Sequence, residues 1–320
     1  MQLNFRIGPV TIAIVANNPP TMWPQHLYDE FKSTDHNTTA DLTIEVQSQK
    51  LSEATGKKIL ASMDDNWRIY SIDHGIGAGY QFEILDKSFF QPRLIARFNA
   101  DWSSAKVWCY EPDQRKTIFK HNWNVGEVCE PLVIWWLTHW AARKNIGILV
   151  HSASVIFETK HGQKAFVFAG HSGAGKTTLS RLCLNQKSAT VLNDERIFIW
   201  KQDPNWFVSG TPWPGMLGEA TQATALLKRI FFLKKGPINR TLPLGTSSPV
   251  SMLLSEMFLP LWDEASMRGS VQLAAEISSR FPVCRLEFLK HPSVVNYLNS
   301  LSTGTEGYLS FLMLTHQCLI

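Results

Sequence analysis

The residues best suited to chemistry lie in one glycine-rich segment. Residues 170–177 read Gly-His-Ser-Gly-Ala-Gly-Lys-Thr, a pattern in which two glycines with four residues between them precede Lys and Thr. Glycines permit positive φ angles, which curl a backbone so that successive N–H groups can hold phosphate oxygens. In this pattern we expect Lys176 to contact the β- and γ-phosphates of ATP and the hydroxyl of Thr177 to bind Mg²⁺. The predicted nucleotide-binding residues are Gly170, His171, Ser172, Gly173, Ala174, Gly175, Lys176, Thr177 and Thr178.

Two adjacent carboxylates, Asp194 and Glu195, come 18 residues after Lys176. Apolar residues flank the pair on both sides, which places it at a strand end or in a turn between two strands. Taken alone, two acidic residues in a turn are usually solvated. Behind a phosphate loop they can divide the work, because Mg²⁺ prefers oxygen ligands and an attacking hydroxyl needs a proton acceptor. We therefore predict that the pair is functional.

The elements around these residues are the ones that a phosphate loop needs. An apolar strand is predicted at 164–169 and a helix at 176–185, so the dipole of the helix favours an anion at the loop. The acidic pair lies between two strands within 190–200, and a stiff loop rich in Pro and Gly follows at 210–215. Further helices are predicted at 128–144, 249–262, 266–280 and 293–301, and further strands at 148–157, 230–234 and 284–289.

The first 125 residues have a different pattern. Short runs rich in β-branched and aromatic residues predict strands at 10–16, 41–47, 67–73, 80–85, 93–98 and 105–110, arranged as an antiparallel meander or a sandwich. We find no catalytic constellation in this half. The sequence thus predicts a β-rich N-terminal domain at 1–125 and an α/β catalytic domain with a mixed sheet at 126–320.

Composition restricts the class of protein. The 12 tryptophans are not interleaved with basic residues, which argues against nucleic-acid binding despite the net charge of +4. The five cysteines are scattered and form no C-x-x-C pair, which favours a reducing compartment over a disulfide framework or a zinc site. The first 18 residues lack the pattern of a signal peptide, and the apolar stretch at 131–142 is too short to span a membrane. We expect a cytoplasmic protein.

Three sequence blocks resemble the C-terminal catalytic domain of HPr kinase/phosphorylase and its HPr-kinase-like relatives, whose fold is similar to the nucleotide site of phosphoenolpyruvate carboxykinase. The blocks are Leu-Val-His-Ser-Ala-Ser-Val at 149–155, the glycine-rich segment at 170–179 and Leu-Asn-Asp-Glu-Arg-Ile at 192–197. The resemblance runs from about residue 149 to 289 and implies a P-loop kinase domain. It also implies that Asp194 is the general base, that Glu195 is associated with the metal, and that His151 lies near the transferred phosphate.

The departures from the family pattern point to the HPr-kinase-like relatives. Glu195 stands where the family usually has a second Asp, and the glycine- and arginine-containing signature of the HPr enzymes is missing after the acidic pair. In its place stand Gly-Thr-Pro-Trp-Pro-Gly at 210–215 and the run at 226–233. Lys228, Arg229 and Arg240 are candidates for a charge clamp on the phosphoryl group. Because relatives often assemble as rings, a homo-oligomer is left open.

Three functions are compatible with these residues. The one that we favour is an ATP-dependent kinase that transfers the γ-phosphoryl group to a hydroxyl, with serine as the acceptor that the resemblance implies. The acceptor is open between a protein, a peptide and a small molecule. The alternatives are a regulatory ATP-binding module without transfer and an ATPase that acts on a partner protein. The ATPase usually needs an aspartate after a further apolar strand, and the stretches at 254–261 and 283–289 offer none.

Overall fold

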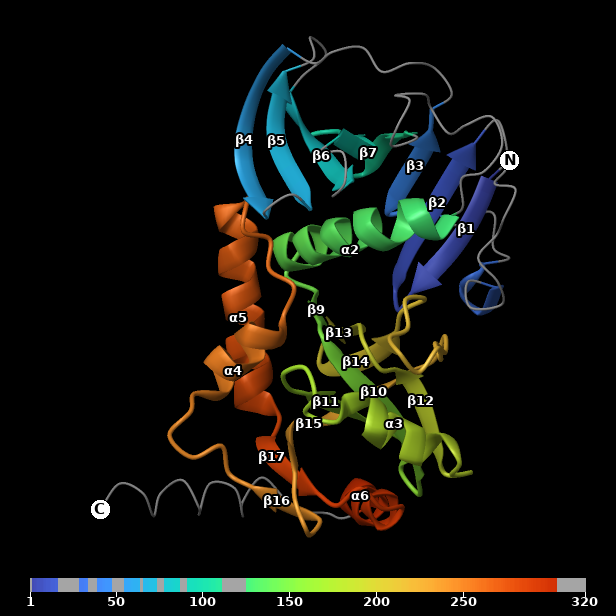
Figure 1. Cartoon of the computed structure of the whole chain (residues 1–320), viewed down its shortest axis with the longest axis vertical. Helices are drawn as coiled ribbons and strands as arrows, with labels where there is room; N and C mark the ends of the chain where they lie inside the picture. The colour runs from blue at the N-terminus through green and yellow to red at the C-terminus, as the bar shows by residue number, and fades with distance from the viewer. Residues whose placement is uncertain are drawn as a thin grey trace. The chain divides into compact units, whose positions relative to one another are not determined.

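The computed structural model describes residues 2–16, 29–33, 39–47, 55–63, 66–73, 78–86, 91–110 and 125–303. The chain is mixed α/β, has few helices, and divides into two compact units (Figure 1). The first unit comprises Met1–Arg143 and Leu259–Met267, and the second comprises Lys144–Phe258 and Arg268–Ile320. We expected a boundary near residue 125. In the structure the helix that begins there belongs to the first unit, and the chain passes to the second unit after Arg143.

The first unit has one eight-stranded sheet within the described residues, in the order β1-β2-β3-β8-β7-β6-β5-β4. Its strands are β1 (Gln2–Ile7), β2 (Val10–Ala16), β3 (Leu42–Val46), β4 (Thr55–Met63), β5 (Trp67–Asp73), β6 (Ala78–Asp86), β7 (Gln91–Phe98) and β8 (Ser104–Cys109). Strands β4 to β8 form the predicted antiparallel meander. Strand β3, however, lies parallel to both β2 and β8, so the sheet is mixed. The chain between these strands is long enough for the crossovers that parallel pairing needs.

Helix α2 (Val125–Arg143) packs in the first unit through aromatic side chains. Trp136 of α2 is fully buried, and its indole N–H donates to the carbonyl of Trp102 at 2.6 Å. The ring of Trp102 stacks on His139, with 4.1 Å between ring centroids, and on Phe98, with 4.5 Å. Trp102 and Trp136 therefore serve packing in the first unit. No helix in the described part of the chain, α2 included, is long and apolar enough to cross a membrane.

The second unit has one nine-stranded mixed sheet within the described residues. Its main path is β12-β10-β11-β15-β14-β13-β9, with β17 beside β15 and β16 beside β17. The strands are β9 (Gly147–Val150), β10 (Ser152–Thr159), β11 (Gly162–Ala169), β12 (Ala189–Asn193), β13 (Ile197–Gln202), β14 (Asn205–Gly210), β15 (Thr224–Lys235), β16 (Arg240–Leu242) and β17 (Val283–Phe288). The helices that follow α2 are α3 (Lys176–Leu184), α4 (Pro249–Glu256), α5 (Glu264–Arg280) and α6 (Ser293–Thr303). Strands β11, β15 and β17 run parallel to one another, side by side.

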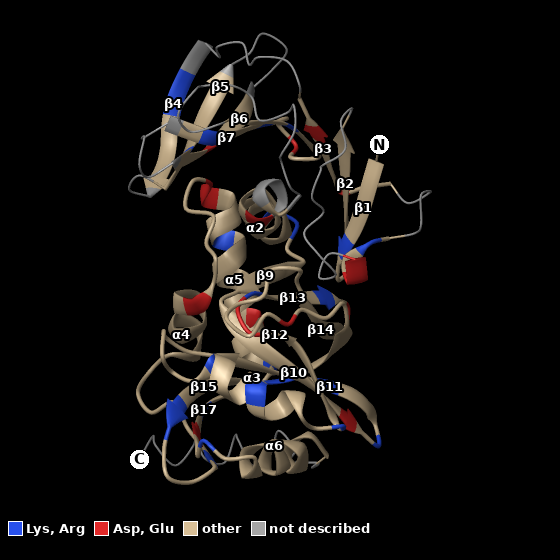
Figure 2. Cartoon of the chain, turned by 45° about the vertical axis from the view of Figure 1, so that its right-hand side comes forward, with Lys and Arg blue, Asp and Glu red and all other residues tan. Residues whose placement is uncertain are grey.

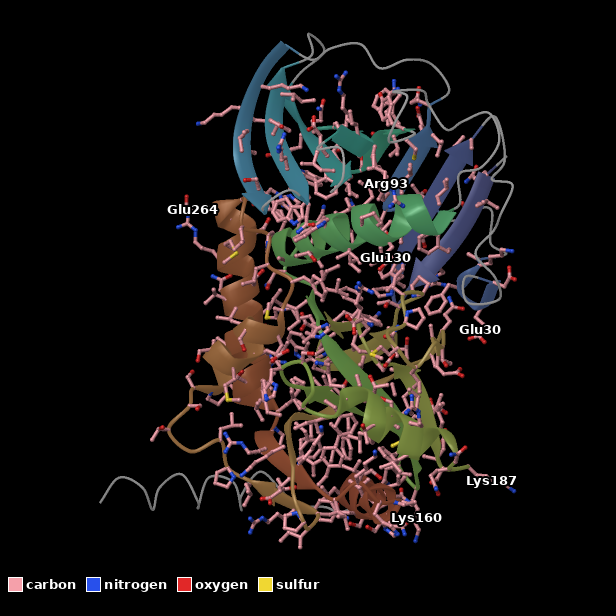
Figure 3. All side chains as sticks on the ribbon, in the orientation of Figure 1. Glu30, Arg93, Glu130, Lys160, Lys187 and Glu264 are labelled. Atoms are coloured by element: carbon pink, nitrogen blue, oxygen red, sulfur yellow. The ribbon has the colours of Figure 1, made fainter. Side chains whose placement is uncertain are left out.

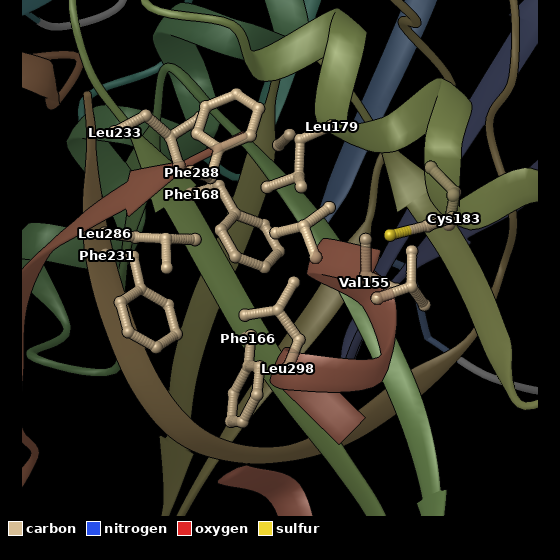
Figure 4. Packing of buried hydrophobic residues seen from close by; sticks show 14 of the residues in the cluster. Val155, Phe166, Phe168, Leu179, Cys183, Phe231, Leu233, Leu286, Phe288 and Leu298 are labelled. Carbon is tan, nitrogen blue, oxygen red and sulfur yellow. The ribbon is translucent and has the colours of Figure 1, made fainter. Parts of the chain in front are cut away.

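A hydrophobic cluster in the second unit joins α3 and α6 to strands β10, β11, β15 and β17 (Figure 4). Leu179 and Cys183 of α3 are fully buried against Phe168 of β11 and against β15 and β17. Alternate residues of the three parallel strands point into this cluster, as the two-residue period of a strand requires. Removing a buried leucine side chain from such a core costs about 2–5 kcal/mol. The packing therefore fixes the start of α3, and with it Lys176 and Thr177, relative to the sheet.

Candidate active site

The topology of the second sheet brings the predicted site residues to one edge. His151 lies between β9 and β10, and these two strands pair with β13 and β12, which flank the acidic turn. The chain at 151–152 therefore lies opposite residues 194–196, and the N–H of Ser152 donates to the carbonyl of Glu195 at 3.2 Å. Ser152 is also level with Ala169, the last residue of β11 before the glycine-rich loop. The three blocks found in the sequence thus meet in space.

The glycine loop, residues 170–175, has the backbone that its sequence predicts. Gly170, Gly173 and Gly175 have φ angles of +143°, +82° and +115°, all in the region that favours glycine. Gly175 is the N-cap of α3 and offers no side chain to the free N–H groups of the first turn. A Cβ at Gly175 would lie 2.7 Å from Cζ of Phe288, so the position also lacks room for a side chain. The predicted strand, loop and helix are all present.

The side chains of Lys176 and Thr177, at the start of α3, both form hydrogen bonds. Lys176 is only 8% exposed, and its ammonium group donates to the carbonyl of Gly170 at the other end of the loop. By contrast, Lys160 and Lys187 are exposed and point away from the second unit (Figure 3). The hydroxyl of Thr177 donates to Oδ2 of Asp194 at 2.9 Å. The start of α3 is therefore joined directly to the acidic turn.

Asp194 is 1% exposed, and both of its carboxylate oxygens accept hydrogen bonds. Oδ1 accepts from the N–H of Gly215 at 2.9 Å, and Oδ2 accepts from the N–H of Leu217 at 3.2 Å as well as from Thr177. Between the two donors, Met216 is 91% exposed. The stiff loop predicted at 210–215 therefore lies at the acidic pair, where its backbone holds Asp194.

The buried side chain of Asn193 holds the acidic turn through hydrogen bonds, a role that the sequence does not predict. Its side chain is fully buried, and its Nδ2 donates to the carbonyls of Thr211 and Trp213 at 2.9 and 3.1 Å. Its Oδ1 accepts from the N–H groups of Glu195 and Arg196 at 2.7 and 3.1 Å. One amide side chain thus ties the acidic turn to the loop that carries Gly215. The only signal in the sequence was its place beside the acidic pair.

Glu195 binds His151 through its carboxylate. Its Oε1 lies 3.3 Å from Nδ1 of His151, and the two side chains are 32% and 36% exposed. The hydrogen bond from His151 lowers the pKa of the Glu195 carboxyl below its ordinary value of 4.5, although partial burial opposes this shift. Arg196 and Lys176 lower this pKa further through their positive charges. Unlike Asp194, this pair can be reached from solvent.

The other predicted residues vary in their surroundings. His171 and Ser172 are exposed, with Nδ1 of the histidine 2.7 Å from the carbonyl of Ser172. Ala174 is buried in the core, and Thr178 is partly buried. Of the predicted charge clamp, Arg240 donates two hydrogen bonds to Oε2 of Glu287, from Nε at 3.0 Å and from Nη2 at 2.8 Å. The guanidinium of Arg229 lies over the ring of Phe231.

Lys228 and Arg229 lie in β15 before the residues that are level with the end of β11. Charges of both signs are spread along the ribbon of the second unit (Figure 2).

Among the described residues, no cluster of three His, Cys, Asp or Glu side chains could hold a metal ion by itself. No protein-family model and no curated protein matches the chain.

Proposed function

We propose that the second unit is an ATP-dependent kinase that transfers a phosphoryl group to a hydroxyl, with serine as the expected acceptor. The observation that carries the proposal is the hydrogen bond between Thr177 and Asp194, because it joins the glycine loop to the acidic turn. A magnesium nucleotide needs these two features side by side. The resemblance of the three sequence blocks to HPr-kinase-like domains supports the same activity and a P-loop kinase fold.

The glycine loop and its flanking residues would hold ATP with Mg²⁺. Backbone N–H groups of the loop and the ammonium group of Lys176 suit the phosphates. The hydroxyl of Thr177 and Oδ2 of Asp194 are hard oxygen donors within 2.9 Å of each other, which suits Mg²⁺, an ion that takes few protein ligands and keeps waters and phosphate oxygens. When bound, Mg²⁺ neutralises charge that develops on the phosphates.

The geometry favours an exchange of the roles that the sequence assigns to the two carboxylates. Asp194 lies beside Thr177, has both oxygens engaged and is closed to solvent, which suits a metal ligand better than a base. Glu195 is accessible and orients His151 through Nδ1, so that Nε2 is left for a substrate hydroxyl. We therefore assign the proton transfer to the pair of Glu195 and His151.

Transfer then requires little covalent chemistry from the protein. The acceptor oxygen forms a bond to the γ-phosphorus as the bond from that phosphorus to the β,γ-bridging oxygen breaks, and ADP leaves. The proton of the acceptor hydroxyl passes to Nε2 of His151, and the carboxylate of Glu195 stabilises the imidazolium. Lys176 remains beside the phosphates and offsets their charge. If water takes the place of the hydroxyl, the same residues hydrolyse ATP, which is how the ATPase alternative is related to the kinase.

The assignment can be tested with two neighbouring variants, Asp194→Asn and Glu195→Gln. Calorimetry measures ATP binding with and without Mg²⁺, and ³¹P NMR detects phosphate esters with HPr, free serine, serine peptides and cell extract. We expect Asp194→Asn to lose the gain in ATP affinity that Mg²⁺ gives. Glu195→Gln should bind ATP normally and form no ester.

The reverse result would return the base to Asp194, as the sequence analysis predicts. If wild-type protein and Lys176→Ala bind ATP equally, or neither binds it, the glycine loop is not a nucleotide site and the proposed function fails. Inorganic phosphate released without any ester would identify an ATPase. ATP binding without ester or inorganic phosphate would favour the regulatory module.

A further inference from the structure

Lys235 is a basic residue at the carboxyl end of β15 that no sequence motif singles out. Strand β15 is parallel to β11, and Phe232 of β15 is level with Ala169, after which the glycine loop begins. Because the strands are parallel, the residues that end β15 lie at the same edge of the sheet as the glycine loop. Consistent with this, a Cβ at Gly170 would lie 3.6 Å from the main-chain nitrogen of Leu233.

The side chain of Lys235 lies on the face of the sheet that α3 covers. Phe231 and Leu233 point into the core cluster beneath α3, and side chains alternate along a strand. Lys235 therefore points to the same face, and Lys234 points to the opposite one. A Cβ placed on Gly175 would lie 3.6 Å from Cε of Lys235, so the aliphatic part of this lysine lies against the glycine loop. The ammonium group is one bond beyond that carbon.

Lys235 has the exposure and the free charge that a ligand contact requires. It is exposed, and no ion pair joins it to a carboxylate of the described residues. Its neighbourhood differs from that of Arg240, whose charge is satisfied by Glu287. Lys234 is level with Glu287 on the neighbouring strand, away from the face of α3.

We propose that Lys235 is a second phosphate-binding lysine, which rests on the proposed function of the glycine loop. Its ammonium group binds a phosphate oxygen of the nucleoside polyphosphate held by that loop. Lys176 acts from within the loop and Lys235 from the neighbouring strand. Two separate cations suit a ligand that carries several negative charges, since each lysine acts as a point charge.

The test compares Lys235→Gln with Lys234→Gln, which removes the same charge from the adjacent residue on the other face. Calorimetry at low salt measures the dissociation constant of ATP with Mg²⁺. We expect Lys235→Gln to weaken binding about tenfold, as expected for one charged hydrogen bond. Lys234→Gln should change binding by less than about twofold, and Lys235→Arg should keep most of the affinity. Both lysines are exposed, so each variant should fold.

Two results would overturn the inference. One is an unchanged ATP affinity in Lys235→Gln, and the other is an equal loss in both glutamine variants, which would indicate a general effect of charge. Lys176→Ala separates this inference from the function on which it rests. If Lys176→Ala abolishes binding while Lys235→Gln does not weaken it, the glycine loop is a nucleotide site and only the role of Lys235 is wrong. If Lys176→Ala binds ATP as well as the wild type, the proposed function fails too.

Discussion

Replacing Asp194 with Asn should destabilise the second unit even without nucleotide. The carboxylate accepts from Gly215 at Oδ1 and from Leu217 and Thr177 at Oδ2. In Asn one terminal atom is an NH₂ group, which only donates. Whichever way the amide turns, the N–H of Gly215 or of Leu217 faces another donor. The residue is 1% exposed, so water has little access to replace the lost acceptor.

The magnitude follows from one buried N–H without a partner and from the loss of charge on the remaining bonds. An unsatisfied buried donor costs about 1–3 kcal/mol, so we expect the free energy of unfolding to fall by about 2 kcal/mol. Urea denaturation at neutral pH measures this loss. Hydrogen exchange of the Gly215 and Leu217 amides should show its site, because at least one of them should exchange faster in the variant.

Met216→Ala is the control for this substitution. Met216 lies between the two donors but is 91% exposed, so its loss should change the free energy of unfolding by less than about 0.5 kcal/mol. The reasoning is refuted if Asp194→Asn is as stable as the wild type and both amides keep their protection. In that case the loop does not depend on an ionised acceptor at Asp194, and the case for this residue as a buried, fixed oxygen donor is lost.

Three further predictions concern buried groups. Burial lowers the pKa of His139 from 6.5 to about 4. The neutral side chain therefore contributes its full stability above pH 6.5, and this contribution is lost as the pH falls toward 4. Urea denaturation at pH 7 and at pH 4.5 should show that the free energy of unfolding falls by about 2 kcal/mol in the wild type, and that this fall is missing in His139→Phe. Gly175→Ala places a methyl group against Phe288 at a φ of +115°. It should lower the free energy of unfolding by about 2 kcal/mol in thermal denaturation and should weaken ATP binding. The control is Gly162→Ala, which has nothing within 4 Å and should lose only about 1 kcal/mol because of its φ of +86°. Asn193→Ala should lower the free energy of unfolding by about 3 kcal/mol, because it leaves two N–H groups and two carbonyls without their buried partner; an unchanged denaturation midpoint would contradict this role.

Local elements were largely predictable because their signals are local. The helix after the glycine loop and strand β17 fall within a residue of their predicted bounds, and the strand before the loop falls within two residues. The strands that were missed begin with polar residues. Strand β4 starts Thr-Gly-Lys-Lys and lies at the edge of its sheet, and β14 starts with Asn205. Because an edge strand needs no continuous apolar run, the pattern of β4 is weak.

The pairing of strands could not be derived from the same signals. The parallel pairs of β3 depend on contacts between residues that are distant in the chain, which no local pattern encodes. The site shows the same limit. The sequence connects Asp194 with the phosphate loop of Thr177 by its spacing alone, and only the family resemblance connects either residue with His151. The contacts of Asn193, and the position of Lys235 beside the glycine loop, required the fold.

Gly215 explains how two adjacent carboxylates can have separate partners. A Cβ at this position would lie 3.0 Å from Oδ1 of Asp194 and 3.0 Å from Oε2 of Glu195, so the backbone of Gly215 lies close to both. Its N–H donates to Oδ1 of Asp194, whereas Oε1 of Glu195 binds Nδ1 of His151. A side chain at residue 215 would force the acidic residues or the loop to move. The Pro-Trp-Pro-Gly sequence therefore ends in a residue without a side chain at the point where both carboxylates approach the loop backbone.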